Sequence, residues 1–109
     1  MSVGHGPERR GTLSERQKKH LRRLAHALKP IVTLGTAGLT EAVVAEFERA
    51  LHDHELVKLR VRAESREARD RSLEELVGRT RCALVQRIGN VATLYRPDPV
   101  LPRILLPDA

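Results

Sequence analysis

A short glycine-containing segment has the clearest chemical implication in the sequence. It reads Gly35, Thr36, Ala37, Gly38, Leu39 and Thr40. Two glycines allow a positive φ and let a ligand approach the backbone with no Cβ in the way. Thr40 is a good N-cap, and the helix that it would begin offers unpaired N–H groups and the positive end of its dipole. The segment therefore predicts a loop that can hold a phosphate group through its backbone.

Two interpretations of this Gly-x-x-Gly segment are open from its residues alone. Two glycines at this spacing often form only a turn. Here, however, an apolar run precedes the glycines and a helix start follows them, and the KH fold clamps a nucleic-acid backbone with a loop in this setting. The setting favours phosphate binding over a plain turn.

The distribution of charge is the second feature that points to an anionic ligand. Residues 9–29 contain eight lysines and arginines and one acidic residue, whereas residues 41–55 contain five acidic residues and one basic residue. A charge run is often only a solvated helix face, but such a face usually mixes both signs. We therefore expect a cationic surface that binds nucleic acid. The expected binding residues are Lys18, Lys19, Arg22, Arg23, Lys29, Gly35, Thr36, Ala37, Gly38, Thr40, Lys58, Arg60 and Arg62.

No group of residues predicts catalysis or a metal site. His52, Asp53 and His54 offer two imidazoles and a carboxylate, but side chains at i and i+2 of a helix end point in different directions. Cys82 is expected to be a small buried apolar residue. The sequence has no Ser/His/Asp grouping, Walker loop or dinucleotide-binding fingerprint. We therefore expect no enzymatic activity and no cofactor.

The first expected element is a basic amphipathic helix. Ser14 and Gln17 have the spacing of a capping box, which predicts its start, and Pro30 is expected to stop it. Its apolar stripe consists of Leu21, Leu24, Ala25 and Leu28. Residues 31–34 then form a short apolar run that predicts a buried strand.

The rest of the chain predicts two more helices and three more strands. The alternation over residues 55–62 indicates a half-buried strand whose outer face carries Lys58, Arg60 and Arg62. The Gly89-Asn90 pair between two apolar runs indicates a β-hairpin. The expected order is α-β-α-β-α-β-β, an α/β (α+β) fold with helices packed on a mixed sheet.

Length and composition fit one small domain. The 109 residues have a net charge of +6 and an isoelectric point near 10.4, which favours nucleic acid, then an anionic membrane, as partner, unless the charge only improves solubility. Two aromatic residues are too few for a base-stacking platform, so backbone contacts are expected to dominate. The single cysteine and the absence of a signal-peptide pattern or a membrane-spanning apolar run predict a cytoplasmic protein. Residues 1–12 are expected to be a flexible basic N-terminus, 13–97 the folded domain, and 98–109 a proline-rich tail that can add a short edge strand at 104–106.

Several motifs in combination resemble one protein family. They are residues 21–30 (LRRLAHALKP), the loop over 35–40, residues 52–58 (HDHELVK), and the hairpin residues 85–89 and 94–97. Over residues 13–107 the chain closely resembles the stand-alone bacterial CRM-domain proteins, the YhbY family. The resemblance implies a four-stranded mixed sheet packed with three helices, similar to the C-terminal domain of bacterial translation initiation factor three. It also implies RNA binding through the Gly-x-x-Gly loop and the adjacent basic surface, in precursors of the large ribosomal subunit.

Three positions depart from the pattern of that family. Arg81 follows the third helix where relatives often have glycine, and a positive φ there would cost stability. Arg87 replaces an apolar residue on the strand face expected for Val85, so either this strand end is exposed or the arginine stem extends to solvent. Asn90 replaces a basic residue at the hairpin tip, which weakens the case for a phosphate contact there.

Two functions are compatible with the sequence. The first is a non-catalytic RNA-binding protein that contacts ribosomal RNA during assembly of the large subunit. The alternative is a protein-interaction adaptor on pre-ribosomal particles, which would use the acidic second helix as its contact without binding RNA directly. Reversing the charges of Arg22 and Arg23 separates the two, because only the first function depends on them.

Overall fold

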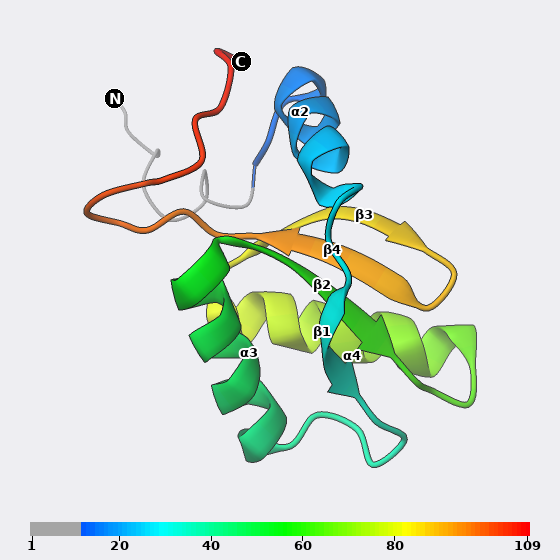
Figure 1. Cartoon of the computed structure of the whole chain (residues 1–109). Helices are drawn as coiled ribbons and strands as arrows, with labels where there is room; N and C mark the ends of the chain where they lie inside the picture. The colour runs from blue at the N-terminus through cyan, green and yellow to red at the C-terminus, as the bar shows by residue number, and fades with distance from the viewer. Residues whose placement is uncertain (1–11) are drawn as a thin grey trace, which may run out of the picture.

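The computed structural model describes residues 12–109 and contains three helices and four strands in that part of the chain (Figure 1). They are α2 (Glu15–Ala25), β1 (Pro30–Leu34), α3 (Glu41–His54), β2 (Leu56–Val61), α4 (Arg66–Thr80), β3 (Ala83–Ile88) and β4 (Val91–Tyr95). The order confirms the expected α-β-α-β-α-β-β succession. The expected flexible N-terminus falls on residues 1–11, which lie outside the described residues, and on Thr12.

The four strands form one mixed sheet in the order β1-β2-β4-β3. β1 runs parallel to β2, whereas β2 and β3 both run antiparallel to β4. The α3 helix makes the crossover between the parallel strands, and the tight turn at Gly89, whose φ is +60°, closes the hairpin of β3 and β4. The sheet edges are therefore β1 and β3.

The sheet has an apolar cluster on each of its faces. The α3 and α4 helices cover one face, and Phe47, Leu59 and Leu76 are among the fully buried residues of that larger cluster. The α2 helix lies on the opposite face, as Figure 1 shows, where Leu21 packs with Tyr95 in the smaller cluster. Because strand side chains alternate, neighbouring residues of β2 and β4 supply the two clusters in turn.

The helix starts agree with the sequence, but the end of α2 does not. Ser14 and Gln17 form the expected capping box, with the Gln17 N–H donating to Ser14 Oγ at 3.0 Å. The helix ends at Ala25, however, five positions before Pro30. Proline restricts only the residue before it, Lys29, so it does not account for an end at Ala25. The chain turns through a Leu28 N–H bond to the Ala25 carbonyl before it reaches β1.

The expected edge strand over residues 104–106 does not form. The N–H of Ile104 instead donates to the carboxylate of Glu55, at 2.9 Å, so it is unavailable for a strand ladder. The tail beyond residue 97 also contacts the domain: Ile104 and Leu106 pack on the α2 cluster, and the Gln17 side chain donates to the Pro107 carbonyl.

The structure settles two of the departures from the family pattern. Arg81 is the C-cap of α4 and has a φ of 60°, the left-handed conformation in which glycine is favoured. The expectation that Val85 and Arg87 share a strand face is wrong. The register of β3 shifts at Val85, so Val85 packs under α2 whereas Arg87 pairs with Asp70 of α4.

Candidate nucleic-acid interface

The Gly-x-x-Gly segment forms a compact turn between β1 and α3. The Gly38 N–H donates to the Gly35 carbonyl at 3.0 Å, and Gly38 has a φ of +88°. Thr36 and Ala37, at the tip, are exposed, and within residues 12–109 their N–H groups have no hydrogen-bond partner. Thr40 caps α3 by accepting a bond from the Val43 N–H at 3.2 Å. The free donors of the loop therefore lie at its tip and at the first residues of α3.

The two glycines of the loop have different structural needs. Gly38 has a positive φ, a backbone conformation that residues with a Cβ rarely adopt. Gly35 has no positive φ, and a Cβ added there would meet no atom within 4 Å. The fold therefore does not require glycine at position 35. Open backbone at this position leaves room for a ligand instead.

A polar hollow of about 290 Å³ lies between the loop and the start of α4. Its lining includes Gly35, Thr36, Gly38, Arg62, Glu64, Arg71 and Ser72, so two arginines outnumber one carboxylate. Arg62 is one of the expected binding residues, whereas Arg71 was not expected. Arg71 was missed because α4 carries many charges of both signs. The small residues Ser65, Ala68 and Ser72 recur at helical spacing, and this pattern could have indicated the helix face that turns toward the loop.

The basic side chains of β2 connect this hollow with the other end of the sheet. Val57, Leu59 and Val61 are buried, while the alternating Lys58 and Arg60 are only half-buried, as expected for a basic outer face. Lys58 pairs in register with Pro30 at the start of β1, and Arg60 pairs with Thr33. The Arg62 N–H then donates to the carbonyl of Leu34, at 2.7 Å, directly before the loop.

The structure does not bring the basic helix α2 next to the loop. The two lie at opposite ends of β1, which spans roughly 16 Å at about 3.3 Å per residue. Figure 1 shows the same separation, with α2 above the sheet and the loop that precedes α3 at the bottom. Lys18 forms an i,i+3 ion pair with Glu15 at 3.6 Å, whereas Lys19, Arg22 and Arg23 form none within the described chain.

Ion pairing separates the arginines into two groups. Arg79 pairs with Glu41 at 2.8 Å, Arg96 pairs with Glu48 at 2.9 Å, and Arg87 pairs with Asp70. The hydrogen bond from Arg79, with its charge, lowers the pKa of Glu41. The expected cations of β2 and the loop end, together with Lys29, form no ion pair in residues 12–109. Their charge is therefore available to an external anion.

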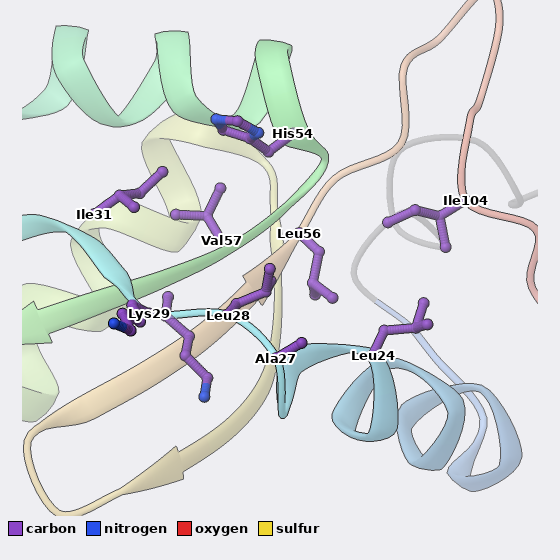
Figure 2. A pocket seen from close by; sticks show the side chains of 10 residues that line it. Leu24, Ala27, Leu28, Lys29, Ile31, His54, Leu56, Val57 and Ile104 are labelled. Atoms are coloured by element: carbon purple, nitrogen blue, oxygen red, sulfur yellow. The ribbon is translucent and has the colours of Figure 1, made fainter.

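An apolar groove of about 330 Å³ lies at the α2 end of the sheet (Figure 2). Leu24, Leu28 and Ile31 line it, and the end of α3 and the C-terminal tail complete its walls. Lys29 and Lys58, both expected binding residues, also border it. Leu24 and Leu28 belong to the expected apolar stripe of the first helix, but they are 41% and 37% exposed.

Glu55 is a structural residue that sequence analysis missed. Its carboxylate is fully buried and accepts backbone N–H bonds from Asp98, Arg103 and Ile104 at 2.7 to 3.1 Å. Burial alone would raise its pKa, but these donors and the Arg103 charge lower the pKa below the ordinary value. The carboxylate thereby attaches the C-terminal tail to the end of α3. The signal was an acidic residue directly before an apolar strand.

Other reactive groups of the described chain are enclosed in the fold. Cys82 is buried, its sulfur accepts a bond from the Thr80 hydroxyl, and burial raises the pKa of the thiol. Burial likewise raises the pKa of Tyr95 to about 12. Residues 12–109 contain no cluster of His, Cys, Asp or Glu suited to a metal ion. No helix in the same range is long and apolar enough to cross a membrane.

The chain belongs to the CRS1/YhbY (CRM) domain family, whose model matches residues 13–96. An RNA-binding protein of Haemophilus influenzae is 49% identical over 87 residues, which cover 80% of this chain and 88% of that protein. The probable RNA-binding protein PA4753 of Pseudomonas aeruginosa is 45% identical over 87 residues, covering 80% and 84% of the two chains.

A solved structure has the same fold. The solution structure of SAV1595 from Staphylococcus aureus, described as a candidate RNA-binding protein, superimposes with a TM-score of 0.75 at 33% sequence identity. The match covers 88% of this chain and all of that one. The family and the fold that the sequence predicted are therefore confirmed.

Proposed function

We propose that this protein is a non-catalytic RNA-binding protein of the cytoplasm that grips the RNA backbone. The observation that carries the proposal is a row of cations that form no ion pair within residues 12–109 and that joins the two ends of the β1–β2 pair. Arg62 and Arg71 lie at the loop end, Arg60 lies between, and Lys58 and Lys29 lie at the α2 end. Membership of a family whose relatives are named RNA-binding proteins supports the same function.

The Gly-x-x-Gly loop supplies the contact that needs no side chain. The exposed tip N–H groups and the start of α3 offer donors to a phosphate oxygen. Arg62 and Arg71 lie beside them and add positive charge on the same hollow. The proposed binding site is therefore a backbone cradle flanked by arginines, with α2 as a separate cationic surface.

The natural target that we propose is large-subunit ribosomal RNA or its precursor, in pre-ribosomal particles. This part of the proposal rests on the family resemblance. The adaptor alternative has a reduced acidic surface on α3, because Glu41 and Glu48 pair with Arg79 and Arg96 and Glu55 is buried. Glu46 and Asp53 remain exposed there.

The experiment that tests RNA binding is a salt titration of affinity for a single-stranded RNA. If about four phosphates are neutralised, the logarithm of the binding constant should fall with the logarithm of salt concentration at a slope of roughly −3. A flat dependence would contradict the proposal. Gly35→Asp adds a negative charge at the loop in a position with ordinary φ and open space, so it should weaken binding without unfolding the protein.

In-cell crosslinking followed by sequencing of the attached RNA tests the natural target. We expect fragments of large-subunit ribosomal RNA, with crosslinked peptides from residues 35–40. If the fragments come from many unrelated RNAs, the protein still binds RNA, but the proposed ribosomal target is wrong. A protein carrying Arg22→Glu and Arg23→Glu should recover fewer fragments than the wild type.

A further inference from the structure

The apolar groove beside α2 has a feature that phosphate binding does not use. Ile31 is 51% exposed although it lies in a strand that also contributes to the core. With Leu24 and Leu28 it forms an aliphatic surface that is open to solvent (Figure 2). Ile31 lies on the α3 side of the groove and Leu24 on its α2 side (Figure 2). Several exposed aliphatic side chains around one groove indicate a binding surface more than an isolated exposed leucine does.

The sheet has two register shifts, each at an apolar residue, and the two residues differ in whether they are buried. In β3 the register shifts at Val85, which is buried because α2 covers it. In β1 the register shifts at Ile31, which lines the groove and is 51% exposed. Such irregularities redirect side chains and often occur beside functional sites. Val85 is buried by packing within the chain, whereas about half of Ile31 stays open to solvent.

The surroundings of the groove favour a nucleotide as its occupant. Lys29 and Lys58 border the aliphatic surface, and neither forms an ion pair in the described chain. A nucleotide joins a flat, largely apolar base to an anionic backbone, so it matches an apolar floor with cations at its edge. The groove is also continuous with the basic side chains of β2 through Lys58, which is part of both.

One exposed ring is available in the groove. Phe47 and Tyr95 are buried, which leaves no aromatic side chain for stacking on the surface of residues 12–109. His54 is exposed at the end of α3 and lines the groove, and an imidazole can stack on a base. The groove therefore offers aliphatic contacts and one planar side chain.

We propose that this groove holds one unstacked base of the RNA strand whose phosphates follow Lys58, Arg60 and Arg62 toward the loop. The proposal rests on the proposed RNA binding and adds a base contact to it. The far wall of the groove is Ile104, which the Glu55 carboxylate holds in place. Docking of the tail is therefore required to complete the groove.

The test compares two single-stranded probes of equal charge. One is an oligouridylate of about twelve nucleotides, and the other is the same ribose-phosphate chain without bases. The wild type should bind oligouridylate about tenfold more tightly than the abasic chain, because the base buries apolar surface and stacks. Ile31→Ala should lose most of this preference and bind both probes with similar affinity.

Matched controls exist for both variants of the groove. Ile88→Ala removes an isoleucine that is 68% exposed at the other edge of the sheet, and it should leave the preference unchanged. His54→Ala should reduce oligouridylate binding several-fold, whereas His52→Ala, on the same helix end but outside the groove, should not. Thermal unfolding of each variant checks that the fold is retained.

Each outcome has a separate meaning. Failure of the wild type to bind either probe would overturn the proposed RNA binding itself. Equal wild-type affinity for the two probes would leave RNA binding intact and overturn the base site, as expected if the groove holds an apolar side chain of a protein partner. Equal losses on both probes in Ile31→Ala would also overturn it, because the variant would then act on phosphate contacts.

Discussion

The hollows at the two ends of the β1–β2 pair differ in their chemistry. The hollow at the loop is lined by glycine backbone, hydroxyl groups, the two arginines Arg62 and Arg71 and one carboxylate, Glu64, whereas the groove at α2 is lined by leucine and isoleucine with lysines at its edge. Backbone N–H groups and guanidinium groups suit a phosphate, and aliphatic side chains suit a group that leaves water.

A single strand separates these two environments. Lys58 borders the groove and Arg62 borders the loop hollow, about 13 Å apart along an extended chain. Affinity for the RNA backbone and preference for bases can therefore be changed separately, because residues at different ends of β2 determine them. A substitution at one end should leave the property of the other end unchanged.

The largest expected effect is that of Glu55→Gln, which disrupts the groove end. The amide retains one acceptor oxygen where the carboxylate accepts three backbone N–H bonds, so we expect a loss of about 3 kcal/mol in unfolding free energy. Denaturant unfolding measures the loss. Affinity for the abasic RNA should change little in the folded variant, and a large change would show that the two ends are not independent.

The same carboxylate predicts an acid sensitivity. Its pKa in the folded protein lies below the ordinary value of 4.5, so its contribution to stability is present above about pH 4.5 and is lost as the pH falls through the folded pKa. The wild type should lose stability in this window, measured by thermal unfolding against pH. The Glu55→Gln protein should lose less, and an equal loss would assign the effect to other carboxylates.

Arg71→Glu alters the loop end. Replacing an attractive charge by a repulsive one beside a phosphate should weaken binding to both RNA probes about thirtyfold at low salt. Arg49→Glu is the matched control, because it changes the net charge equally on the exposed surface of α3. Fluorescence anisotropy measures both, and similar losses would mean that only net charge matters. Arg71→Ala should reduce the salt slope by about one unit.

Alanine substitutions at the two glycines test whether the loop binds phosphate. Gly35→Ala should leave thermal stability unchanged, since its φ is not positive and the space for a Cβ is empty, but should weaken RNA binding several-fold if the backbone is approached there. Gly38→Ala should cost about 1 kcal/mol of stability because of its positive φ. Unchanged binding in Gly35→Ala would place the phosphate elsewhere.

The smallest expected effect lies outside both ends. Arg81 has a left-handed backbone conformation at the end of α4, which glycine adopts more readily. Arg81→Gly should therefore raise the unfolding free energy by roughly 0.5–1 kcal/mol. RNA affinity should not change, because Arg81 lines neither hollow. A decrease in stability would show that the arginine side chain contributes more than its backbone strain costs.

Local signals in the sequence predicted most of the elements correctly. Ser14, Thr40 and Ser65 cap the three helices as expected, since each accepts an N–H bond three residues along the chain. The alternation in β2 predicted its buried and basic faces for the same reason, because side-chain direction in a strand depends only on position. The turn with Gly38 also followed from its own residues.

Contacts between distant segments were not predictable in this way. Arg71 joins the loop hollow because α4 packs beside the loop, and Ile31 faces the groove because β1 shifts register against β2. The expected stripe of α2 failed at Leu24 and Leu28, since helical spacing states which side chains share a face but not whether another segment covers that face.

The family, the order of elements, the helix caps and the unequal distribution of charge could all be predicted from the sequence. These features depend on neighbouring residues, whose spacing along the chain is also their spacing in the structure. The separation of α2 from the loop, the position of β2 between the two hollows and the contact of Glu55 with the tail could be learned from the three-dimensional structure alone. Each of these depends on pairs of residues far apart in the chain, which are brought together by burial of a shared apolar core.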